Sequence, residues 1–253
     1  MVQTILIVMA MEAEAKPFIE HMKLERNEGV LHKHLACELY SGEFTTEAGS
    51  AKIHLVLNGK CPLYGVDIVG TVGAALSTFS AVQALEPDLV INAGTCGGFK
   101  RMGGSVGSIY LCTSFVNHDR RIPLPGFDAF GVGKVKTLEA SSSGLNKALL
   151  EHVGAKEGVV STGNSLDMVK EDEALIKAHD ATCKDMEGAA IAYLCHQLKT
   201  PMFALKSVTD IVDGEHPTSE EFLKNLATAA KALMEALPKV ITFVADGKPI
   251  TSS

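Results

Sequence analysis

The sequence has no basic surplus and no long apolar run, and each absence excludes a class of protein. Its 30 acidic residues outnumber its 23 lysines and arginines, so no basic block is available to neutralise nucleic-acid phosphates. No apolar run approaches the ~20 residues of a membrane-spanning helix. The apolar residues 2–10 are short and have no basic segment before them, unlike a signal peptide. We therefore expect no nucleic-acid and no membrane partner.

Paired cysteine motifs are also missing. The six cysteines form no CxxC pair, and several lie in apolar runs, which indicates free thiols in a reducing compartment. We therefore expect a soluble cytoplasmic protein. His32 and His34 are the only close pair of histidines, and no third ligand lies at a useful spacing. We expect no metal site.

What the sequence does contain is a β–α alternation over its whole length. Its 253 residues are 46% hydrophobic, enough for one domain over 1–253, although two small domains are an alternative. The alternation favours an α/β domain with a largely buried sheet. We expect an ordered functional loop over 117–133 and a frayed tail from about residue 245. Helices are predicted over 12–22, 64–85, 186–198 and from 217 to about 243.

Three of the predicted strands end in acids or glycines. Residues 5–10 run into Glu12 and Glu14, residues 89–93 into a glycine-rich segment, and residues 203–209 into Asp210. A carboxylate at the mouth of a buried strand is costly to desolvate, which makes a site there a reasonable inference. Ligands of open α/β sheets bind beyond the carboxyl ends of the strands. The three strand ends therefore predict one pocket.

Each acid has a structural alternative. Glu12 is either an acid favoured by a helix dipole or a general base, and Glu14 is interpreted as a dipole partner or a solvated residue. Asp213 before Gly214 fits a turn, whereas Asp210 closes an apolar strand and fits a turn less well.

Two further segments are ambiguous on their own. Residues 94–98 (GTCGG) are either a tight turn or a place where a ligand approaches the backbone, but they match neither GxGxxG nor a P-loop. A dinucleotide-binding enzyme is therefore disfavoured. Residues 185–187 (DME) are either a helix cap or a sugar site, in which a carboxylate binds vicinal hydroxyls and a methionine packs on the sugar.

Taken together, six segments resemble the 5′-methylthioadenosine nucleosidases, in their plant-type branch within the nucleoside phosphorylase superfamily. The resemblance covers nearly the whole chain in order, and its most specific parts are DMEGAA at 185–190 and VTDIVDG at 208–214. The other segments are 10–14, 92–99, 118–123 and 161–168. The resemblance implies a three-layer α/β/α domain around a twisted mixed central sheet. It also implies a homodimer that hydrolyses 5′-methylthioadenosine, in methionine salvage, to adenine and 5-methylthioribose without a metal or cofactor.

The resemblance also implies roles for single residues. Asp210 would protonate the adenine, Glu12 would activate the water, and Glu187 would hold the ribose hydroxyls. Lys206 is counted with the substrate-binding residues, although we expect its charge to pair with an acid other than Asp210. The remaining assignments are Met186 packed on the sugar, Thr95 and Cys96 near sugar and water, Leu166 and Asp167 beside adenine, and Phe127 reaching the methylthio group across a dimer interface.

One position departs from the family pattern, and some alternatives stay open. Asn164 stands where the plant-type segment STGDSLDM has its first aspartate, so the order of the adenine loop is less certain than the reaction. A purine or uridine nucleoside phosphorylase is the nearest alternative, disfavoured because Glu12 would repel phosphate. A non-catalytic storage or binding protein of the superfamily is a second. Whether S-adenosylhomocysteine is also a substrate is not decided by these residues.

Overall fold

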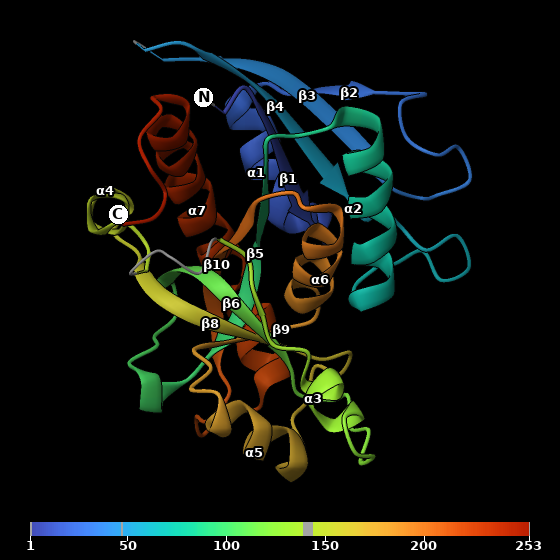
Figure 1. Ribbon diagram of the computed structural model, residues 1–253, viewed down its shortest axis with the longest axis vertical. Coiled ribbons are helices and arrows are strands. Elements are labelled where there is room, and N and C mark those ends of the chain that lie inside the picture. Colours follow the sequence, from blue (N-terminus) through green and yellow to red (C-terminus); the bar gives the residue numbers. More distant parts are fainter. Residues whose placement is uncertain (1, 47, 139–143, 253) are drawn as a thin grey trace.

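The strands of the protein join in one mixed sheet, shown in a computed structural model that describes residues 2–46, 48–138 and 144–252 (Figure 1). The strands are β1 (Thr4–Met9), β2 (Glu25–Asn27), β3 (Glu38–Thr45), β4 (Ser50–Leu57), β5 (Leu89–Gly98), β6 (Ile109–Asn117), β7 (Val135–Lys136), β8 (Lys156–Thr162), β9 (Cys183–Asp185) and β10 (Met202–Ile211). Their order is β10-β6-β8-β9-β5-β1-β4-β3-β2, with β7 beside β6.

The sheet closes on itself at one end. β10 pairs with β5 as well as with β6, so β5, β10, β6, β8 and β9 form a closed ring of strands. β1, β5 and β10 run parallel to one another, and their apolar residues are buried almost without interruption. Such continuous apolar runs are typical of strands covered on both faces. The parallel direction brings the carboxyl ends of these three strands to the same edge.

Helices cover both faces of the sheet, so the predicted three-layer α/β/α fold is confirmed (Figure 1). On one face, α1, α4 and α7 contribute Phe18, Leu149 and Leu233 to one apolar core; α2 and α6 contribute Ala74 and Ile191 to a second core on the other face. The helices are α1 (Glu12–Met22), α2 (Thr71–Leu85), α3 (Phe127–Val132), α4 (Lys147–Val153), α5 (Lys170–Ala178), α6 (Gly188–Leu198) and α7 (Thr218–Ala245), with a short 3-10 helix at Lys100–Met102.

Three expectations from the sequence are corrected. The helix expected over 64–85 begins only at Thr71, because Gly70 has a φ of 94° and the preceding loop is closed by a bridge between Lys60 and Asp67. The loop 117–133 contains the short helix α3. The tail is not frayed: Thr251 bridges to Leu145, and Ile250 packs against the first apolar core, which stabilises the chain end.

Candidate active site

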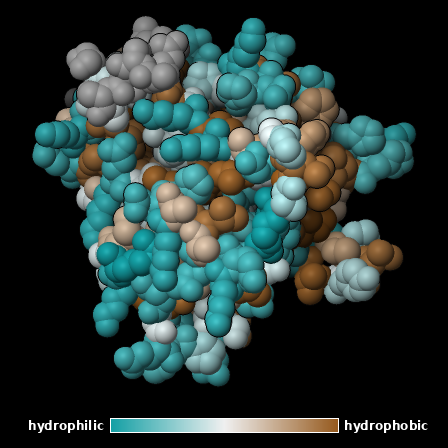
Figure 2. Space-filling model, turned by 60° about the horizontal axis from the view of Figure 1, so that its bottom comes forward, coloured by the Kyte–Doolittle hydropathy of each residue, from teal (hydrophilic) through white to brown (hydrophobic). Residues whose placement is uncertain are grey.

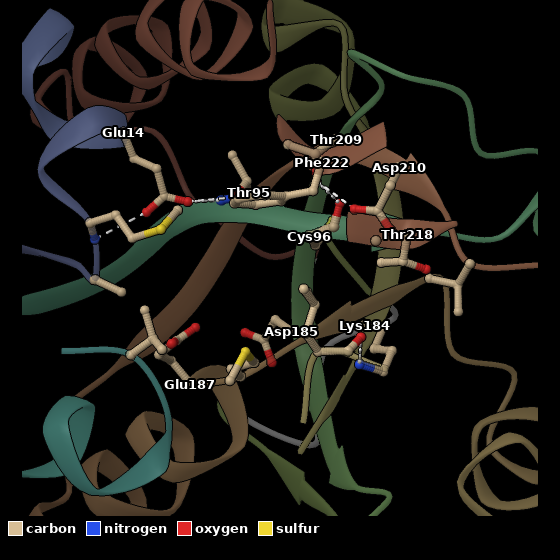
Figure 3. A pocket seen from close by; sticks show the side chains of 17 residues that line it. Glu14, Thr95, Cys96, Lys184, Asp185, Glu187, Thr209, Asp210, Thr218 and Phe222 are labelled. Atoms are coloured by element: carbon tan, nitrogen blue, oxygen red, sulfur yellow. Dashed lines mark hydrogen bonds between the residues drawn. The ribbon is translucent and has the colours of Figure 1, made fainter. Parts of the chain in front are cut away.

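A cavity of about 270 Å³ lies at the carboxyl ends of β1, β5 and β10, where the sequence predicted one pocket (Figure 3). Figure 3 shows the carboxylates of Glu14, Glu187 and Asp210 on different sides of this pocket, with Thr95 and Cys96 of β5 between Glu14 and Asp210. The walls also contain apolar side chains. The lining residues are Ala10, Met11, Glu14, Val69, Thr95, Cys96, Gly97, Leu166, Lys184, Asp185, Met186, Glu187, Thr209, Asp210, Val212, Thr218 and Phe222.

Asp210 is held near the end of β10, where it lines the pocket. Its side chain is buried, and Oδ1 accepts a hydrogen bond of 2.7 Å from the hydroxyl of Thr209. Oδ2 is buried and has no hydrogen-bond partner among the described residues. Burial raises the pKa of the Asp210 carboxyl above its usual value, although the Thr209 hydrogen bond and the charge of Lys184 oppose this. Such a group is suited to hold a proton and donate it to a ligand.

The glycines of β5 explain how Asp210 comes so close to the neighbouring strand. A Cβ on Gly97 would lie 2.9 Å from Asp210 Oδ2 and 2.4 Å from a methyl of Val212. A Cβ on Gly94 would lie 3.5 Å from the Glu14 carboxylate. Residues 94–98 are thus part of the strand and not the tight turn that was one interpretation. The lack of a side chain at Gly97 makes room for the Asp210 carboxylate, whereas a Cβ on Gly94 would only be in ordinary contact with Glu14.

Glu14 is the carboxylate that α1 directs into the pocket. It is buried, and its Oε1 accepts hydrogen bonds from the backbone N–H of Thr95 (2.7 Å) and from the Thr95 hydroxyl (2.6 Å). Its Oε2 accepts a hydrogen bond of 3.3 Å from the backbone N–H of Met11. Three donors fix the carboxylate beside β5, where it can accept a proton from a water molecule or a sugar hydroxyl.

Glu12 does not reach the pocket, which corrects the role that the resemblance suggested for it. It is exposed and forms an ion pair of 3.0 Å with Lys60, which holds the pKa of the Glu12 carboxyl below its usual value. The reason is helical geometry: two positions along a helix turn the side chain by about 200°, so Glu12 and Glu14 face opposite sides. Glu14 lies four residues before the buried Phe18 and therefore on the same side of α1. This spacing could have identified Glu14 as the acid that faces inward.

Glu187 and Asp185 lie on the opposite wall, between β9 and α6. Glu187 Oε1 accepts a hydrogen bond of 2.8 Å from the backbone N–H of Gly70, at the start of α2. Burial, together with the negative charge of Asp185, raises the pKa of the Glu187 carboxyl to about 7. Met186 lies between them and lines the cavity. The segment is therefore more than a helix cap, because it supplies a carboxylate and an apolar surface to the pocket.

The structure brings most of the predicted site residues together. Besides Asp210, Glu187 and Met186, it places Thr95, Cys96 and Leu166 in the pocket wall. Asp167 is exposed and outside the wall. Lys206 is fully buried behind the wall, where it pairs with Asp185 rather than Asp210, as the sequence suggested. Phe127 is 55% exposed on α3 and does not line the pocket of its own chain.

Several wall residues were missed by sequence reasoning, among them Lys184, Thr218 and Phe222. Lys184 of β9 donates from Nζ to the carbonyl oxygens of Ser165 (2.8 Å) and Leu166 (3.0 Å) and so shapes the loop beside Asp210. Thr218 and Phe222 come from the first turns of α7. No local pattern marks these residues, because they reach the pocket only through the packing of β9 and α7 against β5 and β10.

Asn164, the departure from the family pattern, is well placed. Its Oδ1 accepts hydrogen bonds from the backbone N–H (3.0 Å) and the hydroxyl (2.9 Å) of Thr71, and its own N–H donates to Asp119 (2.6 Å). The loop that carries Leu166 is thus fastened to the start of α2 without a charge at residue 164.

Within residues 2–46, 48–138 and 144–252, no group of three or more His, Cys, Asp or Glu side chains is arranged to hold a metal ion. None of the helices in these ranges is long and apolar enough to cross a bilayer.

Comparison with known proteins gives the family. The sequence profile of the phosphorylase superfamily matches residues 4–242. A 5′-methylthioadenosine nucleosidase of Arabidopsis thaliana is 47% identical over 96% of this chain and 88% of its own. A 5′-methylthioadenosine/S-adenosylhomocysteine nucleosidase of the same plant is 43% identical over 96% and 92%.

The solved structures agree. The apo form of an Arabidopsis thaliana 5′-methylthioadenosine nucleosidase superposes with a TM-score of 0.90 at 45% identity and covers 98% of both chains. The match extends over the strands and helices that build the pocket. The chain therefore belongs to the phosphorylase superfamily and, within it, to the family of the 5′-methylthioadenosine nucleosidases.

Proposed function

We propose that the protein hydrolyses the N-glycosidic bond of 5′-methylthioadenosine to give adenine and 5-methylthioribose. The observation that carries this proposal is the buried Asp210, which lines a pocket that also holds Glu14 and Glu187 and whose Oδ2 has no partner among the described residues. Relatives that are 47% and 43% identical bear the names of nucleosidases for this substrate, which supports the choice of nucleoside.

The roles follow from the chemistry of the bond. Adenine is a poor leaving group as an anion, so Asp210 donates a proton to its N7 as the bond between N9 and C1′ breaks. The ribose then carries positive charge, which nearby carboxylates stabilise. Glu14 takes a proton from a water molecule, whose oxygen forms the new bond to C1′, as paired carboxylates do in glycoside hydrolysis. Glu187 accepts hydrogen bonds from the ribose hydroxyls, and Met186 packs on the sugar.

Phosphorolysis fits the pocket less well. A phosphorylase needs a cationic site for phosphate, commonly built with arginine. The described wall contains no arginine, and its only cation is Lys184, whose Nζ already donates to two backbone carbonyls. Lys60 lies outside the wall and is neutralised by Glu12 and Asp67. Glu14 would repel a phosphate placed beside Thr95.

We predict that the products are adenine and free 5-methylthioribose, and that inorganic phosphate leaves the rate unchanged. The physical reason is the pocket, which offers carboxylates to activate water and no free cation to bind phosphate. Chromatography of the products, with and without phosphate, checks this. A phosphorylated sugar product would overturn the hydrolase assignment, and no adenine release at all would favour a binding or storage protein.

We further propose that the active unit is a homodimer. Exposed apolar side chains gather on one side of the molecule, where α2 and α3 lie (Figures 1 and 2). On α2, Val72, Leu76 and Phe79 recur at helical spacing and are 71%, 48% and 44% exposed. Apolar surface of this kind marks an interface. The surface continues to the pocket, because Val69, just before α2, is both exposed and part of the pocket wall.

The occupant of this surface is a second copy of the chain. Phe127 and Phe130 of α3 are half exposed and do not line the pocket of their own chain, so they can contact a substrate only in another subunit. In this arrangement Phe127 closes the methylthio end of the partner's pocket.

We expect Phe127→Ala to weaken binding of 5′-methylthioadenosine by about tenfold while adenine binding changes little. The loss corresponds to an apolar contact of one to two kcal/mol, on the order of one or two buried methylene groups. Titration calorimetry with both ligands measures the difference, and Phe44→Ala, on the far strand β3, is a control. Sedimentation that shows a fully active monomer at micromolar concentration would contradict the dimer.

A further inference from the structure

Lys206 is a lysine with no access to solvent. It lies in the middle of β10, inside the closed ring of β5, β10, β6, β8 and β9, and its side chain is 1% exposed. Its neighbours in register are Gly94 on β5 and Tyr110 on β6. The buried thiols of Cys96, Cys112 and Cys183 lie close enough for the charge of Lys206 to act on each of them. A lysine is rarely buried in this way without a charged partner.

The partner is Asp185, which is also fully buried. Lys206 Nζ lies 2.8 Å from Asp185 Oδ2. The same oxygen accepts a hydrogen bond of 2.8 Å from the backbone N–H of Gly188, and Oδ1 accepts one of 2.5 Å from the hydroxyl of Thr162. A Cβ on residue 188 would lie 2.8 Å from Oδ2, so a glycine is needed there. The Asp185 carboxylate is thus fixed by three donors, one of which is a cation.

These contacts fasten the segment that carries Glu187. Asp185 and Thr162 satisfy the first two N–H groups of α6, because the Thr162 hydroxyl oxygen accepts a hydrogen bond of 2.8 Å from Ala189 N–H. Glu187 lies between Asp185 and this first turn. With Oε1 of Glu187 bound to Gly70 N–H, Oε2 is left for a ligand. The buried ion pair therefore anchors the segment that carries Glu187, the carboxylate that we assign to ribose binding.

A buried ion pair is not needed for stability as such, because apolar residues of similar volume often stabilise a fold equally well. Its position under a functional carboxylate points to a role in that carboxylate's charge. We propose that Lys206 is a positioning residue for ribose recognition: it holds the Asp185 carboxylate in place and adds a positive charge near Glu187, so that Glu187 faces the pocket as a carboxylate. This inference rests on the proposed function, since it takes Glu187 to bind the ribose hydroxyls.

The charges around Glu187 give the sign of the effect. Burial raises the pKa of Glu187 to about 7; the charges of Asp185 and Glu14 raise it too, whereas Lys206 and the Gly70 N–H lower it. A carboxylate accepts hydroxyl hydrogens best when ionised, so kcat/KM should fall as pH falls through about 7. Removal of Lys206 takes away a charge that lowers the pKa of Glu187, so this fall of kcat/KM at low pH, the acid limb of the profile, should move to higher pH. Removal of the Asp185 charge alone should move it to lower pH.

The test is the pH profile of kcat/KM for 5′-methylthioadenosine in Lys206→Met and Asp185→Asn. A nearby charge shifts a pKa by about one unit or more. We therefore expect Lys206→Met to lose about tenfold in kcat/KM below pH 7, mainly through KM, and to recover at higher pH. The acid limb of the Asp185→Asn profile should move to lower pH. Lys60→Met, which removes a surface lysine paired with Glu12, is the matched control and should keep the wild-type profile.

Two further measurements separate the possible failures. Thermal unfolding shows which variants are folded. If only one of the two variants folds, the direction in which its acid limb moves relative to the wild type decides whether the proposal holds. The loss in Lys206→Met should be smaller for the 2′-deoxy analogue of the substrate, because fewer hydroxyls then depend on Glu187. Folded variants whose acid limb coincides with that of the wild type would overturn the role of Lys206. Failure of the wild type to release adenine would instead overturn the proposed function.

Discussion

Asp210→Asn should abolish most of the hydrolysis of 5′-methylthioadenosine, by about 10²- to 10⁴-fold in kcat, while the fold is kept. The asparagine has nearly the same volume and can still accept the Thr209 hydrogen bond, but it cannot donate an acid proton to adenine. Binding should change little, because the amide N–H₂ can still form a hydrogen bond to N7 of the base. Single-turnover kinetics together with calorimetry of nucleoside binding separates the two effects.

Asp213→Asn is the matched control for this variant. Asp213 lies three residues further along the chain, but its carboxylate accepts hydrogen bonds from the backbone N–H groups of Lys100 (2.6 Å) and Arg101 (3.1 Å) and does not line the pocket. Its substitution should cost some stability and little activity. If Asp210→Asn keeps more than about a tenth of the wild-type rate, a general-acid role with the usual contribution is excluded.

The position of the site could be predicted from the sequence, because it depends on where three parallel strands end. The apolar runs that end at Ala10, Ala93 and Asp210 indicated three buried strands, and parallel strands bring such ends to one edge of a sheet. The pocket contains residues from all three. The glycines at 94–98 were harder to interpret, because glycine is a poor strand former. β5 nevertheless continues through them, and Gly97 lets Asp210 come close to the strand.

Contacts between distant elements could not be predicted in the same way. Lys184 reaches the pocket because β9 lies antiparallel beside β5, and Phe222 because α7 packs on β10. The buried pair of Lys206 and Asp185 needs the ring of strands to close, which no local pattern reveals. For Lys206 the sequence suggested only that its charge pairs with an acid other than Asp210. The start of α2 was misjudged because the largely apolar residues 64–70 seemed to continue the helix, but they include Gly65 and Gly70, which both have positive φ.

The two acids of α1 give the sharpest comparison. Glu14→Gln should lower kcat for 5′-methylthioadenosine by about 10²- to 10⁴-fold, because the side chain that takes the proton of the attacking water can no longer do so. The glutamine keeps the length of the side chain, and its carbonyl oxygen can still accept the hydrogen bonds from Thr95. The loss should therefore appear in kcat more than in KM or in thermal stability.

Glu12→Gln, two residues away, should keep nearly the full rate. Glu12 is exposed, and its ion pair with Lys60 joins two side chains that are each about half exposed, so its removal should change the free energy of unfolding little. Steady-state kinetics of both variants, measured side by side with the wild type, decides between the two carboxylates. Equal losses in the two variants, or a larger loss in Glu12→Gln, would show that Glu14 is not the group that activates water.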